Sequence, residues 1–420
     1  MTDRELGFAT RAIKAASRVP RVDQQPTAVP IYQTATFAAA DADELGDILT
    51  ETRHGYAYSR TDNPTIVALG DAVAELEGAE AGYALATGIA AIHATLVSLL
   101  RSGDRVVAGR LMYGSTRVLL VDVLGRLGIQ TTFVDITDHA AVEAALADAP
   151  TRVLYAETIA NPTTAVADIA GLSELAHRHG ATLVVDNTFA SPYVCRPLEL
   201  GADVVVESAT KWLGGHNDLM AGVVAGDRAR VAEIRRIQID TGGTLAPMIA
   251  FLVLRGILTL AVRLERSSAT ARALAGWLER QDGVDRVLYP GLASHPQAAL
   301  AGRAFRTGGG MLAFEVAGGR EAAAAFIDGL TLPERTASLG GVHTIVIHPP
   351  TTSHRQLGDA ALAEAGIAAG LLRCSVGLED ADDLVADFER GLGRARAVAG
   401  VAGGSATSAE PAEAQPAVAR

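Results

Sequence analysis

The sequence contains very few cysteines. Cys195 and Cys374 are the two in 420 residues, and they lie too far apart to match a disulfide framework or a metal-binding spacing. A reducing compartment is therefore indicated, with both thiols acting as small core residues and no metal site expected. Residues 1–5 lack the basic start and apolar stretch of a signal peptide, so we expect a cytoplasmic protein.

Positive charge and long apolar runs are scarce as well. The sequence has 36 Lys and Arg against 48 Asp and Glu. The formal net charge of −12 gives no general positive potential that would attract nucleic acid. Residues 248–264 approach the length of a membrane span, but Arg255 and Arg263 interrupt them, which favours a buried helix and no membrane contact. With 49% hydrophobic residues, the composition is that of a globular protein acting on small molecules.

The stretch 61–250 alternates short apolar runs with helical patterns. Helical spacing at 89–100 and 172–179 separates runs that are typical of strands. Alternation of this kind predicts an α/β domain with a mostly parallel mixed sheet. The predicted strands are residues 83–86, 105–108, 131–134, 152–156, 182–185, 203–206 and 220–225.

The remaining chain divides around this large domain. Residues 1–60 carry several prolines and exposed-looking aromatics, and we expect them to form an arm. A long helix near 248–280 leads into a smaller α+β domain over 251–398, with strands at 311–316 and 344–347. Residues 399–420 have too few apolar side chains to offset the entropy of ordering, so a disordered tail is predicted.

Lys211 is the most informative single residue. It follows the apolar run 203–206, stands behind the hydroxyls of Ser208 and Thr210, and precedes Gly214 and Gly215. A lysine that holds an aldehyde cofactor needs a strand end, anion-binding hydroxyls and room for close approach. The alternative is a lysine that extends from the strand end into solvent.

Two further strand ends carry matching features. Asp186 closes the run 182–185, where a carboxylate could pair with a protonated pyridine nitrogen, although an ordinary turn aspartate would look the same. Gly88 and Ile89 open a helix after the run 83–86, and their free amides could bind a phosphate or simply begin a capped helix.

Three residues outside these strand ends could bind anions. Tyr58 and Arg60 in the arm could capture a phosphate if a partner chain brings them over, or could form a solvated loop pair. Arg373 sits inside an apolar strand, where a guanidinium needs an anion such as a substrate carboxylate.

Taken together, these segments resemble the trans-sulfuration family of pyridoxal-phosphate (PLP) enzymes, which includes methionine γ-lyases, cystathionine γ-lyases and γ-replacement synthases. The similarity runs from about residue 7 to residue 398. The matching segments are 30–37, 58–60 with 63–65, 113–114, Glu157 with 161–162, 185–188, 208–211, 338–341 and 373–377.

The resemblance implies a fold-type I large domain, a smaller C-terminal α+β domain and a homotetramer built from dimers, with the arm contacting a neighbouring subunit. Lys211 would hold PLP covalently and carry protons, and Tyr113 would stack on the ring. The other cofactor contacts would come from Asp186, Asn161, Gly88, Ile89, Ser208 and Thr210, with Tyr58 and Arg60 from the neighbour. Arg373 and Ser338 would hold the carboxylate of an amino-acid substrate.

The expected reaction is γ-elimination on a sulfur amino acid such as methionine, cystathionine or homocysteine, giving 2-oxobutanoate, ammonia and a thiol. γ-Replacement by a synthase or sulfhydrylase is the alternative, and a regulatory PLP-binding protein with low turnover is a more distant one. Ser115, Gln238 and His343 differ from residues typical of the lyases, so specificity is expected to depend on them. His343 either acts near the Cγ leaving group or packs as a structural side chain.

Overall fold

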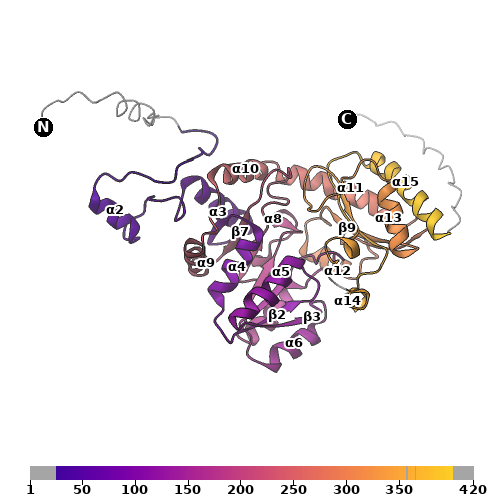
Figure 1. The fold of residues 1–420 in the computed structure, drawn as a ribbon, viewed down its shortest axis with the longest axis horizontal. Coiled ribbons are helices and arrows are strands. Elements are labelled where there is room, and N and C mark those ends of the chain that lie inside the picture. The colour runs from indigo at the N-terminus through magenta and orange to yellow at the C-terminus, as the bar shows by residue number, and fades with distance from the viewer. Residues whose placement is uncertain (1–24, 356–357, 365, 401–420) are drawn as a thin grey trace, which may run out of the picture.

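The computed structural model describes residues 25–355, 358–364 and 366–400, and its strands form two sheets (Figure 1). The first sheet has seven strands in the order β1-β7-β6-β5-β4-β2-β3. Their bounds are β1 Ala81–Leu85, β2 Arg105–Gly109, β3 Gln130–Val134, β4 Val153–Glu157, β5 Thr182–Asp186, β6 Val204–Glu207 and β7 Gly222–Gly226. The predicted strands are confirmed to within a few residues.

Most neighbours in this sheet run parallel, while β7 runs antiparallel to both β1 and β6. The predicted mostly parallel mixed α/β sheet is therefore confirmed. Parallel strands bring their carboxyl ends to one edge, where ligands bind in open α/β sheets. Here Glu157, Asp186 and Glu207 close the adjacent strands β4, β5 and β6, with Glu157 in register with Asp186.

Helices cover both faces of the seven-stranded sheet (Figure 1). Along β4 the side chains alternate: Tyr155 points into one apolar cluster and Leu154 into the other, as the two-residue period of a strand requires. The segments around this sheet are α3 Pro64–Glu77, α4 Gly88–Leu99, α5 Gly114–Val118, η1 Leu119–Leu124, η2 Gly125–Leu127, α6 His139–Asp148, α7 Ile169–Arg178, α8 Ser191–Val194, η3 Pro197–Leu200, α9 Arg228–Thr241 and α10 Pro247–Ile257.

The second sheet is antiparallel, with the order β10-β11-β9-β8, and it packs against helices of the C-terminal part (Figure 1). Its strands are β8 Val284–Leu288, β9 Met311–Val316, β10 Ile345–Ile347 and β11 Leu371–Ser375. The accompanying segments are α11 Leu260–Leu278, α12 Ala298–Ala304, α13 Gly319–Gly329, η4 Pro349–Thr351, α14 Asp359–Glu364 and α15 Ala381–Ala399. The domain boundaries at residues 60, 250 and 398 stay predictions.

The long helix predicted near residues 248–280 is wrong, because α10 and α11 are separate helices bent by 58°. The break follows from tertiary contacts at Gly256, whose carbonyl accepts from the Arg263 guanidinium at 2.7 Å and from the Thr259 amide at 3.2 Å. Among the described residues no single helix is long and apolar enough to cross a membrane, and α10 with α11 passes that test only as this bent pair.

The N-terminal segment projects away from both sheets (Figure 1). Its helix α2, Ala42–Leu49, has no buried residue, and Leu49 is 61% exposed. The segment is tied to the body near α3, where the Tyr32 amide donates to Thr65 Oγ1 at 2.9 Å. The first 24 residues of the predicted arm, and all but Ala399 and Gly400 of the predicted tail, lie outside the described residues.

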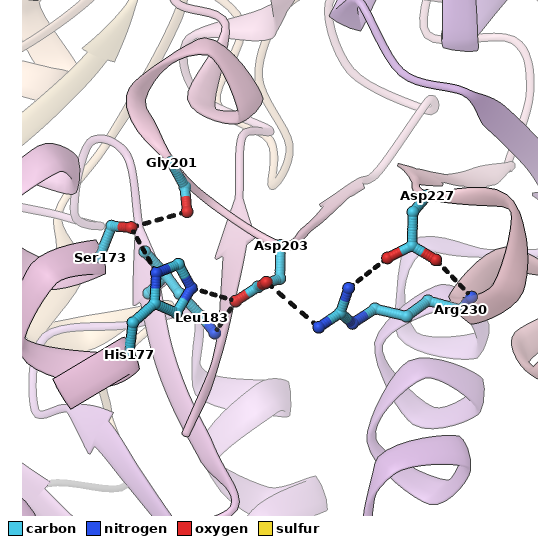
Figure 2. A network of polar contacts seen from close by, with 7 residues as sticks. All are labelled: Ser173, His177, Leu183, Gly201, Asp203, Asp227 and Arg230. Carbon is cyan, nitrogen blue, oxygen red and sulfur yellow. Dashed lines mark hydrogen bonds and ion pairs between the residues drawn. The ribbon is translucent and has the colours of Figure 1, made fainter. Parts of the chain in front are cut away.

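A polar network fixes the amino ends of β5 and β6, opposite the edge that carries the strand-end carboxylates (Figure 2). Asp203 accepts hydrogen bonds from the Leu183 amide at 2.8 Å and from His177 Nε2 at 2.9 Å, and it pairs with Arg230 at 3.2 Å. Because His177 belongs to α7 and Arg230 to α9, one carboxylate joins two strands to two helices. The site at the other edge therefore rests on a braced sheet.

Candidate active site

A cavity of about 790 Å³ opens at the carboxyl ends of β4, β5 and β6. Ten of the residues predicted for the site line it, and they come from segments more than 280 residues apart in the sequence. These residues are Gly88, Ile89, Tyr113, Asn161, Asp186, Ser208, Thr210, Lys211, Ser338 and Arg373.

Lys211 lies in the turn after β6, and its amine donates to Ser338 Oγ at 2.7 Å. Removal of the amine from water, with a smaller contribution from the nearby Arg373 charge, lowers the pKa of Lys211 to about 8. The described residues include no carboxylate in ion-pair contact with this amine. The cavity thus holds a lysine with a substantial neutral fraction near physiological pH, as covalent attachment to an aldehyde requires.

Asp186 forms part of the cavity floor. Its Oδ2 accepts from the Tyr155 hydroxyl at 3.1 Å, and its Oδ1 accepts from the Thr188 amide at 3.0 Å. Burial raises the pKa of Asp186, since no cation lies close enough to offset the loss of water. A protonated pyridine nitrogen would provide such a cation, so the acid fits the nitrogen end of PLP.

The start of α4 fits the phosphate. Thr87 caps the helix, with its Oγ1 accepting from the Ala90 amide at 3.0 Å, and the amides of Gly88 and Ile89 precede the first amide that donates within the helix, that of Ala91. A Cβ at Gly88 would lie 2.8 Å from the Cβ of Ser208, so glycine is needed for this close approach. The Gly88 and Ile89 amides and the Ser208 hydroxyl together form an anion-binding site between α4 and the turn that carries Lys211.

Arg373 fits the carboxylate of an amino acid. Its Nη1 donates to Asn161 Oδ1 and its Nη2 donates to the Ser338 carbonyl, each at 2.9 Å, while its buried Nε has no partner among the described residues. Burial lowers the pKa of Arg373 to about 10. A buried guanidinium held only by neutral acceptors can receive a substrate anion.

The loop that carries Ser338 comes very close to the Lys211 turn. Gly340 has a φ of 78° in the left-handed region, and a Cβ there would lie 2.9 Å from the carbonyl carbon of Lys211. Glycine therefore allows the loop to place Ser338 against the Lys211 amine.

Glu157, Tyr155 and Thr188 hold the predicted site residues, although the sequence did not single them out for these roles. Glu157 accepts from the Tyr113 amide at 2.6 Å and from the Asn161 amide at 3.1 Å. The Tyr113 side chain is 46% exposed at the cavity rim. The position of Glu157 at the end of a predicted strand could have indicated its role, because the ends of adjacent parallel strands lie side by side, as Glu157 and Asp186 do.

Five predicted residues lie outside this cavity. Gln238 is buried in α9, where its side-chain amide donates to Thr244 Oγ1 at 2.9 Å. Arg60 donates to the Ile239 carbonyl at 2.6 Å, and its guanidinium lies over the Tyr58 ring at 5.6 Å. Ser115 in α5 and His343 before β10 are both exposed, and neither lines the cavity. No three His, Cys, Asp or Glu side chains gather in the described chain in a way that could hold a metal ion.

Comparison with known proteins gives a consistent picture. The family model described as "Cys/Met metabolism PLP-dependent enzyme" matches residues 9–393. The L-methionine gamma-lyase of Pseudomonas putida is 46% identical over 92% of this chain and 97% of its own length. The O-succinylhomoserine sulfhydrylase of Pseudomonas aeruginosa is 42% identical, with 92% and 95% of the two chains covered.

Solved structures agree with the sequence relatives. Cystathionine gamma synthase from Xanthomonas oryzae pv. oryzae, solved with aminoacrylate and cysteine, superposes with a TM-score of 0.83 at 37% identity. The alignment covers 88% of this chain and 93% of that one. The relatives thus include both lyases and γ-replacement enzymes.

Proposed function

We propose that this chain, which belongs to the Cys/Met metabolism family of PLP-dependent enzymes, is a lyase that breaks the Cγ–S bond of a sulfur amino acid. The observation that carries the proposal is the Lys211 amine, which faces the same cavity as Asp186 and has its pKa lowered to about 8. The 46% identity to a methionine γ-lyase supports elimination as the main reaction.

When bound, PLP supplies an electron sink that stabilises negative charge at the substrate carbons. Asp186 would keep the pyridine nitrogen protonated, the Gly88 and Ile89 amides with Ser208 and Thr210 would hold the phosphate, and Tyr113 would cover the ring. Asn161 would bind on the side of the ring hydroxyl. The cavity positions of these residues and the chemistry of their donors and acceptors support these roles.

Lys211 has a second role once the substrate amine has taken its place. Its Nζ accepts the proton from substrate Cα and moves it toward Cβ and the departing group, which a lysine with a pKa near 8 can do in either direction. Arg373 fixes the substrate carboxylate and so orients the Cα proton toward Nζ. Ser338 holds the amine in position through its 2.7 Å hydrogen bond.

γ-Replacement is the second candidate, and the cavity mouth favours it in one respect. Arg335 and Arg355 line this mouth and are exposed, so an anionic γ-substituent such as a succinyl ester would meet positive charge there. Methionine carries no such group. The reaction partner, thiol or water, then decides the product.

One assay separates the two reactions. Purified protein is incubated with L-methionine, L-cystathionine or O-succinylhomoserine, with and without cysteine, and both 2-oxobutanoate and thioether are quantified. A lyase releases 2-oxobutanoate and thiol from methionine or cystathionine without added thiol. Product formed solely from O-succinylhomoserine with cysteine contradicts the lyase assignment, and turnover that persists in Lys211→Ala contradicts the site itself.

The complete site is proposed to include Tyr58 and Arg60 from a second copy of the chain, in a dimer that pairs into a tetramer. The exposed α2 segment supports this, since an amphipathic helix with no buried residue needs a partner surface. Mixing inactive Lys211→Ala and Arg60→Ala subunits should restore part of the activity, because a hybrid dimer contains one intact site. Mixtures that stay inactive despite subunit exchange contradict a shared site.

A further inference from the structure

Two buried glutamates lie behind the floor of the cavity. Glu77 is the last residue of α3 and Glu207 the last residue of β6, and their exposed fractions are 0% and 2%. They come from positions 130 residues apart and meet below the turn that carries Lys211. Neither lines the cavity.

The Glu77 and Glu207 carboxyl groups lie within hydrogen-bonding reach of each other. Ionised carboxylates are acceptors only, so this contact requires a proton on one of them. Glu77 Oε2 and Glu207 Oε1 are buried, and no N–H or O–H group of the described residues donates to either atom. Without the proton, two buried anions would face each other with nothing between them.

The charged surroundings reinforce this requirement. Arg196 is the cation near Glu77, and its Nη1 is already paired with Glu199 at 2.5 Å. Asp186 adds negative charge on the side of Glu207, and burial together with Glu77 and Glu199 raises the pKa of the Cys195 thiol near Glu77. Burial is the largest cause that raises the pKa of Glu77 to about 7 and that of Glu207 well above its ordinary value.

Both glutamates are connected to the loops that hold the cofactor. Asn187, directly after Asp186, donates to Glu77 Oε1 at 2.8 Å and accepts from Thr158 Oγ1 at 2.8 Å. Ser208, directly after Glu207, donates its amide to Thr188 Oγ1 at 2.8 Å. The carboxyl pair therefore lies at the junction of the Asp186 loop and the Ser208 turn.

We propose that Glu77 and Glu207 share one proton and act as a positioning pair, which holds the Asp186 loop and the Ser208 turn in the geometry that binds the cofactor. The inference rests on the proposed cofactor site and adds a dependence on pH. A carboxyl whose pKa is raised in the folded state stabilises that state at low pH, and the contribution is lost as the pH rises through about 7 for Glu77. Cofactor affinity should thus weaken on the alkaline side.

The test compares Glu207→Gln and Glu207→Leu with the unaltered protein. The amide of Gln donates permanently to Glu77, so the alkaline loss of cofactor should move upward by about one pH unit or more, with affinity retained at lower pH. Leu leaves Glu77 Oε2 without a donor and should weaken cofactor binding roughly tenfold at every pH. Glu75→Gln is the matched control, since this exposed acid lies on the same helix α3 and outside the pair, and its profile should not change.

Infrared difference spectra supply an independent readout on protein with or without cofactor. The carbonyl stretch of a protonated carboxyl should be present near neutral pH, and the part of it that belongs to the pair should be lost in Glu207→Gln, while the buried Glu157, whose pKa burial raises to about 8, gives the same contribution in both proteins. Absence of this band in the unaltered protein, or identical alkaline profiles for the Gln variant and the unaltered protein, overturns the inference. If the unaltered protein fails to bind cofactor through Lys211, the proposed function fails instead, while the infrared result still decides the shared proton.

Discussion

Replacing Arg263 with methionine should destabilise the protein at the turn that carries Lys211. Arg263 is 5% exposed and has no ion-pair partner among the described residues. Its Nη1 donates to the Trp212 carbonyl at 2.8 Å and its Nη2 to the Gly256 carbonyl at 2.7 Å. The guanidinium thus joins the residue after Lys211 to the break between α10 and α11.

The expected magnitude follows from these contacts. The Trp212 carbonyl left without a donor costs about 1–3 kcal/mol. The Gly256 carbonyl keeps the Thr259 amide at 3.2 Å and loses a charged bond worth about 1.5–3 kcal/mol, which gives about 2.5–6 kcal/mol in all. Removing the guanidinium also relieves its own desolvation, which the lowered pKa of about 10 reflects. We therefore expect a net loss of about 2–4 kcal/mol, together with a roughly 10²-fold loss in kcat from misplacement of Lys211.

Urea unfolding at fixed protein and saturating cofactor concentrations measures the first quantity, and steady-state kinetics the second. Arg266→Met is the matched control, because Arg266 lies on the same helix and pairs with Asp380 at the surface. That variant should lie within about 1 kcal/mol of the unaltered protein. If Arg263→Met also stays within about 1 kcal/mol and keeps its kcat, the brace assigned to Arg263 does not exist.

Three further outcomes are expected. Asp186→Asn should lower kcat/KM about 10²- to 10³-fold, because a neutral amide cannot pair with the pyridinium; a smaller effect than tenfold would speak against the ring-nitrogen role. Arg373→Lys should raise KM roughly tenfold or more, with less change in kcat, since the paired N–H geometry for a carboxylate is lost; an unchanged KM would place the carboxylate elsewhere. The rate at which apoprotein takes up PLP should rise with pH and level off above about 8, because the amine reacts as its neutral form and its pKa is lowered; a rise continuing toward pH 10 would contradict the buried amine.

The sequence predicted the residues that sit at strand ends. Asp186 and Lys211 follow short apolar runs, and parallel pairing brings such ends to one edge whatever the intervening loops do. Gly88 could be predicted for the same reason, because a strand followed by the capped start of a helix forms an anion-binding site.

Contacts between distant segments were beyond the reach of sequence patterns. At the break after Ile257, the Arg263 guanidinium donates to the Gly256 carbonyl, which a continuous helix would use for its own backbone bond. The apolar pattern of the sequence continues through the break and does not indicate this contact. Glu77 and Glu207 each look like an ordinary acid at the end of an element, and their proximity depends on how α3 packs against β1 and β7. Local periodicity cannot report such pairing.

The most direct measurement of the central claim is to trap the cofactor on its lysine. Lys14 and Lys211 are the two lysines in the sequence, so borohydride reduction of the PLP-loaded protein followed by peptide mass mapping has two possible targets. Reduction should fix one pyridoxyl group per chain on the peptide that contains Lys211, and Lys211→Ala should yield none. A pyridoxyl group on Lys14, or none on either peptide after cofactor saturation, would contradict the account.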